Sequence, residues 1–260
     1  MLKQLRNLLS FLTVLPFRMD EDLLVDCARF MFLFPLIGAL IGLLAGLFGW
    51  VAFYFFVPSL VVGALVLGVL LLLTGLHHTD GLLDFGDGVM AHGSPERKIE
   101  VMHDQFTGAG GLTLGIMTFL VTAFSIAELV RPNTVWGIPV IVSGLVVVEV
   151  SAKLSMVVGA WAGKAVHQGM ASSFLEAMHG GKGSARLVAA LAIAFGIAGP
   201  LMWFTGLGLS GFGVVLSAVL AGLVMVAIAH RNFKGVTGDV LGATNEIARM
   251  VSVVVLVAMI

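Results

Sequence analysis

Long apolar runs separated by short polar connections dominate the chain. A helix needs about 20 apolar residues to cross a membrane, and seven candidate spans meet or approach this length. They cover residues 30–57, 60–76, 111–130, 135–161, 187–205, 212–230 and 241–260. The last run is apolar only from Ile247, so its helix has to begin upstream, near Leu241. The pattern predicts an all-α fold, a polytopic transmembrane helical bundle formed by one domain over residues 1–260.

The N-terminus carries a different pattern. Leu2, Leu5, Leu9 and Leu12 repeat at helical spacing, which predicts a short amphipathic helix lying at the membrane interface. Basic residues precede an apolar run, as in a signal peptide, but a polar stretch follows at residues 18–22 instead of a small-residue cleavage site.

Composition supports a membrane protein. Charged residues make up 11% of the chain and hydrophobic residues 59%, whereas a soluble domain carries about 25% charged residues. The formal net charge of −1 gives no reason to expect a nucleic-acid partner. Cys27 is the single cysteine, so a disulfide framework is excluded.

The basic residues predict the topology. Of the 14 Lys and Arg residues, 12 fall on the N-terminal side of the predicted spans, which the positive-inside rule assigns to the cytoplasm. These 12 are Lys3, Arg6, Arg18, Arg29, Arg97, Lys98, Lys164, Lys182, Arg186, Arg231, Lys234 and Arg249. We therefore expect a multi-pass protein of the cytoplasmic (inner) membrane, in contact with lipid. Its polar connections 77–110, 162–185 and 231–246 should face the cytoplasm and meet in one site.

The first polar connection carries an acidic motif. Asp80, Asp84 and Asp87 fall within about 60° of one another on a helix, and three like charges on one face favour a bound cation. Ligands with only oxygen donors suit Mg²⁺ or Mn²⁺. The alternative is a solvated acidic face. Three glycines weaken a regular helix here and would let the backbone approach a phosphate closely: Gly81, Gly86 and Gly88.

Arg97, Glu100 and Asp104 follow at helical spacing. Asp104 is a candidate further metal ligand, and Arg97 is a candidate clamp for a phosphate group. The residues alone favour an ordinary amphipathic surface helix.

The third polar connection contains Thr237, Gly238, Asp239 and Glu246 at the predicted start of the last helix. The free N–H groups of a helix start suit a phosphate, and a helix capped by Asp239 is an equally good interpretation. Within the fourth span, Glu149 and Lys153 stand four residues apart.

Such a pair either neutralises itself inside the bundle or borders an active site. His167 and His179 are best interpreted as ordinary loop histidines.

Several of these segments resemble one known family, cobalamin synthase, the adenosylcobinamide-GDP ribazoletransferases. The similar segments run in the same order over nearly the whole chain: residues 8–16, 34–38, 78–88, 102–111 and 237–246. The most specific is His78-Thr79-Asp80-Gly81-Leu82-Leu83-Asp84 followed by Asp87-Gly88. The chain departs from the family pattern at four positions: Thr79, Leu83, His103 and Gln105.

The resemblance implies an Mg²⁺-dependent phosphotransferase. The 3′-hydroxyl of α-ribazole, or of its 5′-phosphate, would displace GMP from adenosylcobinamide-GDP and give adenosylcobalamin or its phosphate. The implied catalytic residues are His78, Asp80, Asp84, Asp87, Arg97 and Asp104, and the implied Mg²⁺ ligands are Asp80, Asp84, Asp87 and Asp104. The implied substrate-binding residues are Thr237, Gly238, Asp239, Glu246 and Lys153.

Three other classes of protein are weighed against this interpretation. An ion- or proton-coupled transporter would use Asp80, Asp84, Glu149 and Lys153 as a relay, but most acidic residues lie in connections on one side. A metalloprotease would need His-Glu-x-x-His, which is absent from the sequence. A structural subunit would not need three acidic elements on one face. The sequence leaves open whether the protein forms a homo-oligomer.

Overall fold

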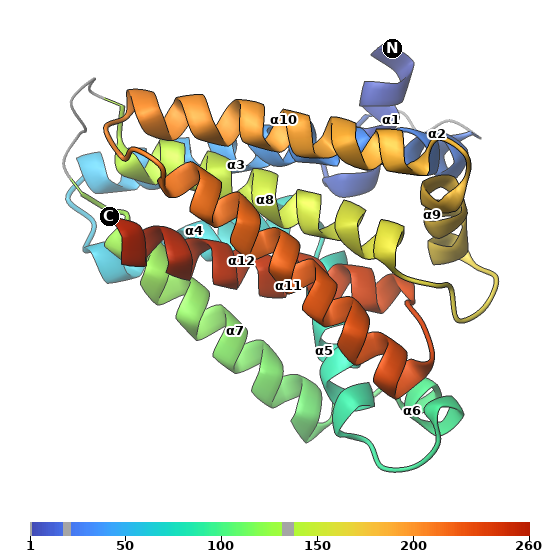
Figure 1. Ribbon diagram of the computed structural model, residues 1–260. Helices are drawn as coiled ribbons and strands as arrows, with labels where there is room; N and C mark the ends of the chain where they lie inside the picture. The colour runs from blue at the N-terminus through green and yellow to red at the C-terminus, as the bar shows by residue number, and fades with distance from the viewer. Residues whose placement is uncertain (1, 18–21, 132–137) are drawn as a thin grey trace.

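The computed structural model describes residues 2–17, 22–131 and 138–260 (Figure 1). Within these ranges the chain forms helices and no named strand, which confirms the all-α prediction. The helices are α1 (Leu2–Leu12), α2 (Leu23–Arg29), η1 (Met31–Leu33), α3 (Phe34–Tyr54), α4 (Ser59–Leu73), α5 (His77–Met90), α6 (Pro95–Met102), α7 (Ala109–Glu128), α8 (Val140–Ala162), α9 (Met170–His179), α10 (Gly183–Phe204), α11 (Ser210–Phe233) and α12 (Gly238–Met259).

Six helical segments in the described ranges are long and apolar enough to cross a membrane: η1 with α3, and α7, α8, α10, α11 and α12. The number becomes seven only if α4 and α5 are counted as one span, and these two helices are bent by 97° at their junction. The 15 residues of α4 reach about 22 Å, which is less than the roughly 30 Å thickness of a bilayer's hydrocarbon core. The polar helix α5 lies outside the six spans. The chain is a multi-pass membrane protein.

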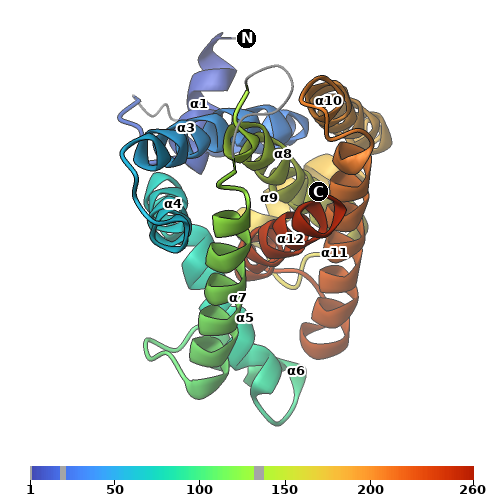
Figure 2. The ribbon, with the colours of Figure 1, turned by 90° about the vertical axis from the view of Figure 1, so that its left-hand side faces the viewer.

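Helix α8 occupies the centre of the bundle, between α3, α10, α11 and α12 (Figure 2). Each of its residues from Val140 to Ala160 is buried. Three glycines of α3 allow this packing, since a Cβ at Gly38, Gly42 or Gly46 would lie within 2.7 Å of the α8 backbone. Small residues spaced four apart let two membrane helices approach closely. Exposed leucines and phenylalanines cover the outer helices.

The glycines of the acidic motif have the same function. A Cβ at Gly81 would lie 2.8 Å from the carbonyl oxygen of Asp239 in α12, and one at Gly86 would lie 2.8 Å from the Cα of Gly111 in α7. The motif therefore forms a regular helix that packs tightly against two others. These glycines are predicted to weaken a regular helix, and α5 is helical across them because close packing compensates for their low helix propensity.

The polar connections gather at one end of the bundle (Figure 1, right), where α1, α2, α6, α9 and the start of α12 lie. The predicted loop 162–185 contains a helix, α9, whose Phe174, Leu175 and Met178 are buried. The predicted N-terminal helix is present as α1. Helix α8 begins at Val140, and residues 135–137 of the predicted span 135–161 lie outside the described residues.

Candidate active site

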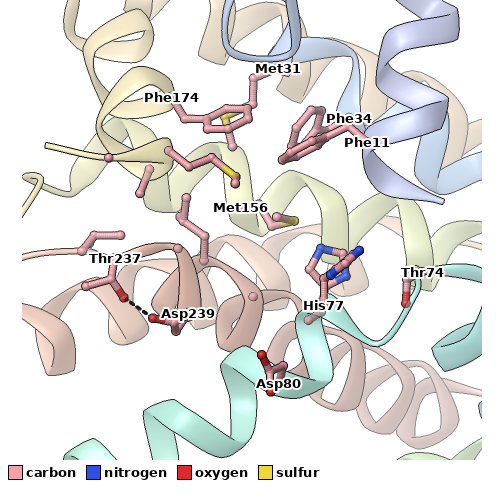
Figure 3. Close-up of a pocket in the computed structure, with 18 of the residues that line it drawn as sticks. Phe11, Met31, Phe34, Thr74, His77, Asp80, Met156, Phe174, Thr237 and Asp239 are labelled. Carbon is pink, nitrogen blue, oxygen red and sulfur yellow. Dashed lines mark hydrogen bonds between the residues drawn. The ribbon is translucent and has the colours of Figure 1, made fainter. Parts of the chain in front are cut away.

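A cavity of about 520 Å³ opens at the end of the bundle where the polar connections gather (Figure 3). Its wall comes from α1, α2, η1, α3, α5, α8, α9 and α12 and from the loops before α5, α7, α9 and α12. A volume of several hundred Å³ is typical of a small-molecule site. The polar side chains of the wall are Ser10, Thr74, His77, His78, Asp80, His103, His167, Thr237 and Asp239.

A sharp turn places α5 against this cavity. Gly75 and Leu76 both have positive φ angles, 66° and 62°, and they turn the chain through the 97° bend between α4 and α5. Leu76 is unusual in this conformation, because a side chain makes the left-handed region costly. The turn brings His77, His78 and Asp80, all in the first turn of α5, into the cavity wall.

Three carboxylates converge where α5 meets α12. Asp80 and Asp239 both line the cavity, one from each helix, and Asp84 lies one turn beyond Asp80. Burial, together with the nearby charges of Asp80, Asp239 and Asp87, raises the pKa of the Asp84 carboxyl to about 7. Such an anionic cluster favours a cation or a proton.

Asp87 is bound by the start of α7. Its two carboxylate oxygens accept the backbone N–H groups of Gly108 at 2.6 Å and Gly111 at 2.8 Å. These donors belong to the start of α7, where a helix has unsatisfied N–H groups and a positive dipole end. Asp87 therefore fixes α7 to α5, a function that its spacing in the sequence does not indicate.

Arg97 and Asp104 lie on the exposed connection between α5 and α7. Arg97 Nη1 donates to Glu100 Oε2 at 2.9 Å, and both side chains are about two-thirds exposed. Asp104 Oδ1 accepts the backbone N–H of Phe106 at 3.3 Å. The structure brings neither residue into the cavity wall, so their predicted functions as phosphate clamp and metal ligand remain untested predictions.

The predicted Mg²⁺ ligands do not form one compact group in the described part of the chain. Within residues 2–17, 22–131 and 138–260, no three His, Cys, Asp or Glu side chains stand close enough to hold one metal ion together. Mg²⁺ is commonly bound by one or two carboxylates together with water and substrate phosphates. The oxygen donors of Asp80 and Asp84 fit that mode of binding. The full four-ligand set with Asp87 and Asp104 remains a prediction.

The histidines of the cavity differ in their surroundings. His78 is buried, and its Nδ1 has no hydrogen-bond partner among the described residues. Burial lowers its pKa well below the usual value, and the charges of Lys153, Arg249 and His77 act in the same direction, so its imidazole is neutral. His103 is exposed, and its Nε2 lies 4.0 Å from Asp239 Oδ2. His167 lies in the loop before α9, as predicted, and it also lines the cavity.

The start of α12 is held in place by a short parallel bridge between Ala165 and Val236. Thr237 caps the helix, because its Oγ1 accepts the backbone N–H of Val240 at 3.3 Å. The Thr237 hydroxyl also donates to Asp239 Oδ2 at 3.3 Å. The predicted cap, Asp239, is thus not the cap and is directed to the cavity, with Gly238 beside it.

Glu246 and Lys153, both predicted to bind substrate, lie instead in a buried network outside the cavity wall. Lys153 Nζ donates to Asn245 Oδ1 at 2.6 Å, and Asn245 Nδ2 donates to Glu246 Oε1 at 3.1 Å. Arg249 donates to Glu246 and, through Nε and Nη2, to Glu149.

The two carboxylates and two cations of this network carry no net charge. Glu149 therefore accepts from Arg249, while Lys153 donates to Asn245 in the same network, so the predicted neutralisation inside the bundle involves four charged residues instead of two. Arg249 is fully buried in α12, so it also leaves the predicted cytoplasmic set, which keeps 11 of its 12 basic residues.

The aromatic half of the cavity was missed at the level of sequence. Phe11, Phe34 and Phe174 line it together with Met31 and Met156. Phe11 and Phe34 fall in segments that resemble the family, whereas nothing in the surrounding sequence distinguishes Phe174 from other apolar residues. Only the packing of α1, α3 and α9 brings the three rings together.

Comparison with known proteins agrees with the resemblance seen in the motifs. The profile of the family described as cobalamin-5-phosphate synthase matches residues 4–257. Proteins named adenosylcobinamide-GDP ribazoletransferase are similar over nearly the full chain. The one from Methanocella arvoryzae is 34% identical, over 100% of this chain and 97% of its own.

The relative from Methanosarcina barkeri is 32% identical, over 96% of this chain and 90% of its own. The relative from Methanococcoides burtonii is 30% identical, over 97% and 90% of the two chains. No solved structure matches. The profile match and the length of these similarities establish that this chain belongs to the cobalamin-5-phosphate synthase family.

Proposed function

We propose that this protein transfers the adenosylcobinamide phosphoryl group from adenosylcobinamide-GDP to the 3′-hydroxyl of α-ribazole or its 5′-phosphate. The new bond joins the ribazole oxygen to the phosphorus attached to cobinamide. The bond from that phosphorus to the bridging oxygen breaks, GMP leaves, and the hydroxyl proton is released. The names of the full-length relatives support this reaction. None of these names supports the transporter alternative.

The observation that carries the proposal is the meeting of Asp80 and Asp239 in one cavity wall, with Asp84 beside them. Phosphoryl transfer depends mainly on positioning and on neutralising charge. Asp80 and Asp84 are the residues that would hold Mg²⁺, which would neutralise charge on the diphosphate. Thr237, Gly238 and the start of α12 would orient a phosphate. A carboxylate of the cluster or neutral His78 would accept the hydroxyl proton.

The test is incubation of purified protein with adenosylcobinamide-GDP, ribazole and Mg²⁺. We expect GMP and a cobamide to appear together in equal amounts, and chelation of Mg²⁺ to stop both. Mg²⁺ should also raise the melting temperature of the wild-type protein by ligand linkage, and a variant with both Asp80→Asn and Asp84→Asn should show no such rise. Turnover that survives exhaustive chelation would contradict the metal assignment.

The site is proposed to face the cytoplasm from the inner membrane. The 11 remaining basic residues of the predicted set support this orientation. In a Cys27→Ser background, a cysteine at position 209 should react with an impermeant maleimide in intact cells, whereas one at position 92 should react only after permeabilisation. The reverse labelling pattern would show that the protein has the opposite orientation in the membrane.

A further inference from the structure

We propose that Phe11, Phe34 and Phe174 bind the flat base of the acceptor nucleoside. This inference rests on the proposed function, because that reaction requires an acceptor nucleoside to enter the cavity. The site would take an apolar, methylated bicyclic base of the benzimidazole class. The ribose of the same nucleoside would then be directed to Asp80 and Asp239.

The three rings form one aromatic cluster from distant parts of the chain. The ring centroids of Phe11 and Phe174 are 5.4 Å apart, those of Phe34 and Phe174 are 6.0 Å apart, and those of Phe11 and Phe34 are 6.4 Å apart. These separations are typical of aromatic rings in contact. Met31 and Met156 complete the wall, and thioether sulfurs also pack well against aromatic rings.

The cavity has two chemically different ends (Figure 3). Phe11, Phe34, Phe174 and Met31 gather at one end, and Asp80, Thr237 and Asp239 lie at the other, with Met156 and His77 between them. A nucleoside has the same polarity along its length, an aromatic base joined to a hydroxylated ribose. Placing the base among the phenylalanines directs the ribose hydroxyls towards the carboxylates, where the transfer requires them.

The aromatic end favours the acceptor base over the guanine of the donor. Two hydroxyls of the cavity wall already donate to main-chain carbonyl groups, Ser10 to Arg6 at 3.0 Å and Thr74 to Leu70 at 3.0 Å. Guanine carries several donors and acceptors on its edge, and burying them without partners is costly. A dimethylbenzimidazole has two methyl groups and a single free ring acceptor, so it loses little in such a site.

Two helices outside the candidate spans supply two of the three rings. Phe11 belongs to α1 and Phe174 to α9, and both pack onto Phe34 at the start of α3. The N-terminal helix is therefore part of the binding site as well as a candidate contact with the membrane surface.

The test measures binding and turnover in parallel. Phe11→Leu and Phe174→Leu keep an apolar side chain of similar volume and remove the ring. Each should weaken ribazole binding to the full-length protein, measured by equilibrium dialysis without donor, by about tenfold. Each should raise the KM for ribazole similarly and leave the KM for adenosylcobinamide-GDP unchanged. Phe174→Tyr, which keeps the ring, should retain wild-type affinity.

The matched control is Phe195→Leu, which removes a ring stacked on Phe212 at 5.6 Å outside the cavity. This variant should change neither the affinity for ribazole nor the KM for adenosylcobinamide-GDP. Free dimethylbenzimidazole should compete with ribazole on the wild-type protein, and free guanine should not, which keeps the test decisive if a leucine variant fails to fold.

Unchanged ribazole binding in folded leucine variants would overturn the inference, and so would a rise in the KM for the donor alone. If the wild-type protein binds ribazole through these rings but releases no GMP, the proposed function fails and the subsite stands.

Discussion

Helix α12 carries two clusters of charged groups that are compensated in opposite ways. Near its start, Asp239 joins Asp80 and Asp84 in a cluster of carboxylates. Their charges have the same sign, and the charges of Asp80 and Asp239 help to raise the pKa of Asp84. About two turns later, Glu246 and Arg249 join Glu149 and Lys153 in a buried network without net charge. A buried charge needs a partner within the protein, so the second cluster is structural. The first is left for a ligand to complete.

The largest effect should come from breaking the buried network. Arg249→Met leaves Glu149 and Glu246 buried without their partner, and removing one member of a buried ion pair costs about 3–5 kcal/mol. We expect the variant to lose its cooperative thermal unfolding in detergent. Arg97→Met removes an exposed ion pair with Glu100 and should cost at most about 1 kcal/mol. Equal losses of stability in Arg249→Met and Arg97→Met would show that the buried network is not structural in the sense described above.

Substitutions in the carboxylate cluster should lower turnover without lowering stability, the opposite of substitutions in the buried network. Asp80→Asn and Asp84→Asn preserve shape and remove charge, so turnover should fall by about 10²–10³, as when an electrostatic group of a transition state is removed. Stability in metal-free buffer should be equal to or above that of the wild type, because repulsion is relieved. Glu128→Gln, at the opposite end of the bundle, serves as the control. Near-normal GMP release from both aspartate variants would show that the cluster is not the active site.

A double variant sharpens the distinction between structure and substrate binding. Lys153→Met or Glu246→Gln alone leaves the network with an unpaired charge, whereas the two together leave the Glu149–Arg249 pair neutral and intact. Thermal unfolding should therefore show a smaller loss for the double variant than for the worse single one. A double variant that folds normally and has lost substrate affinity would instead support the predicted binding function of Lys153 and Glu246.

The smallest effect concerns the contact between α5 and α12. A Cβ at Gly81 would lie 2.8 Å from the Asp239 carbonyl oxygen, so Gly81→Ala has to push the two helices apart. Overpacking of this kind costs about 1–3 kcal/mol, and turnover should fall because Asp80 and Asp239 separate. Gly68→Ala in α4 meets no atom within 4 Å and should affect neither melting temperature nor rate.

The spans could be predicted because the length of an apolar run is a local property. The order of the spans and the start of α12 upstream of its apolar run follow from this property alone. Seven spans were predicted, whereas six helices qualify by themselves, because α4 has only 15 residues. The 97° bend before α5 could not be predicted in this way, because it depends on Leu76 adopting a left-handed conformation that its residue type disfavours.

The candidate site could be predicted only in part, again because sequence patterns report local properties. The resemblance and the helical spacing of Asp80 and Asp84 pointed to the acidic wall, and Asp239 was found through its motif. The helical spacing of Asp87 placed it with Asp80 and Asp84 and gave no indication of its hydrogen bonds to the start of α7. Glu149 stands one turn from Lys153, which suggested a local pair, yet its partner is Arg249, 100 residues away. Partners this distant leave no periodic signal in the sequence.

That separation has a consequence for how the chain is made. Helix α8 emerges from the ribosome 100 residues before Arg249 does, which corresponds to about 5–20 s of synthesis. During that interval Glu149 lacks its final partner, and the opposite charge nearest to it along the chain is Lys153, one helical turn away. The arrival of α12 then gives Glu149 its long-range partner, so this helix completes the centre of the bundle.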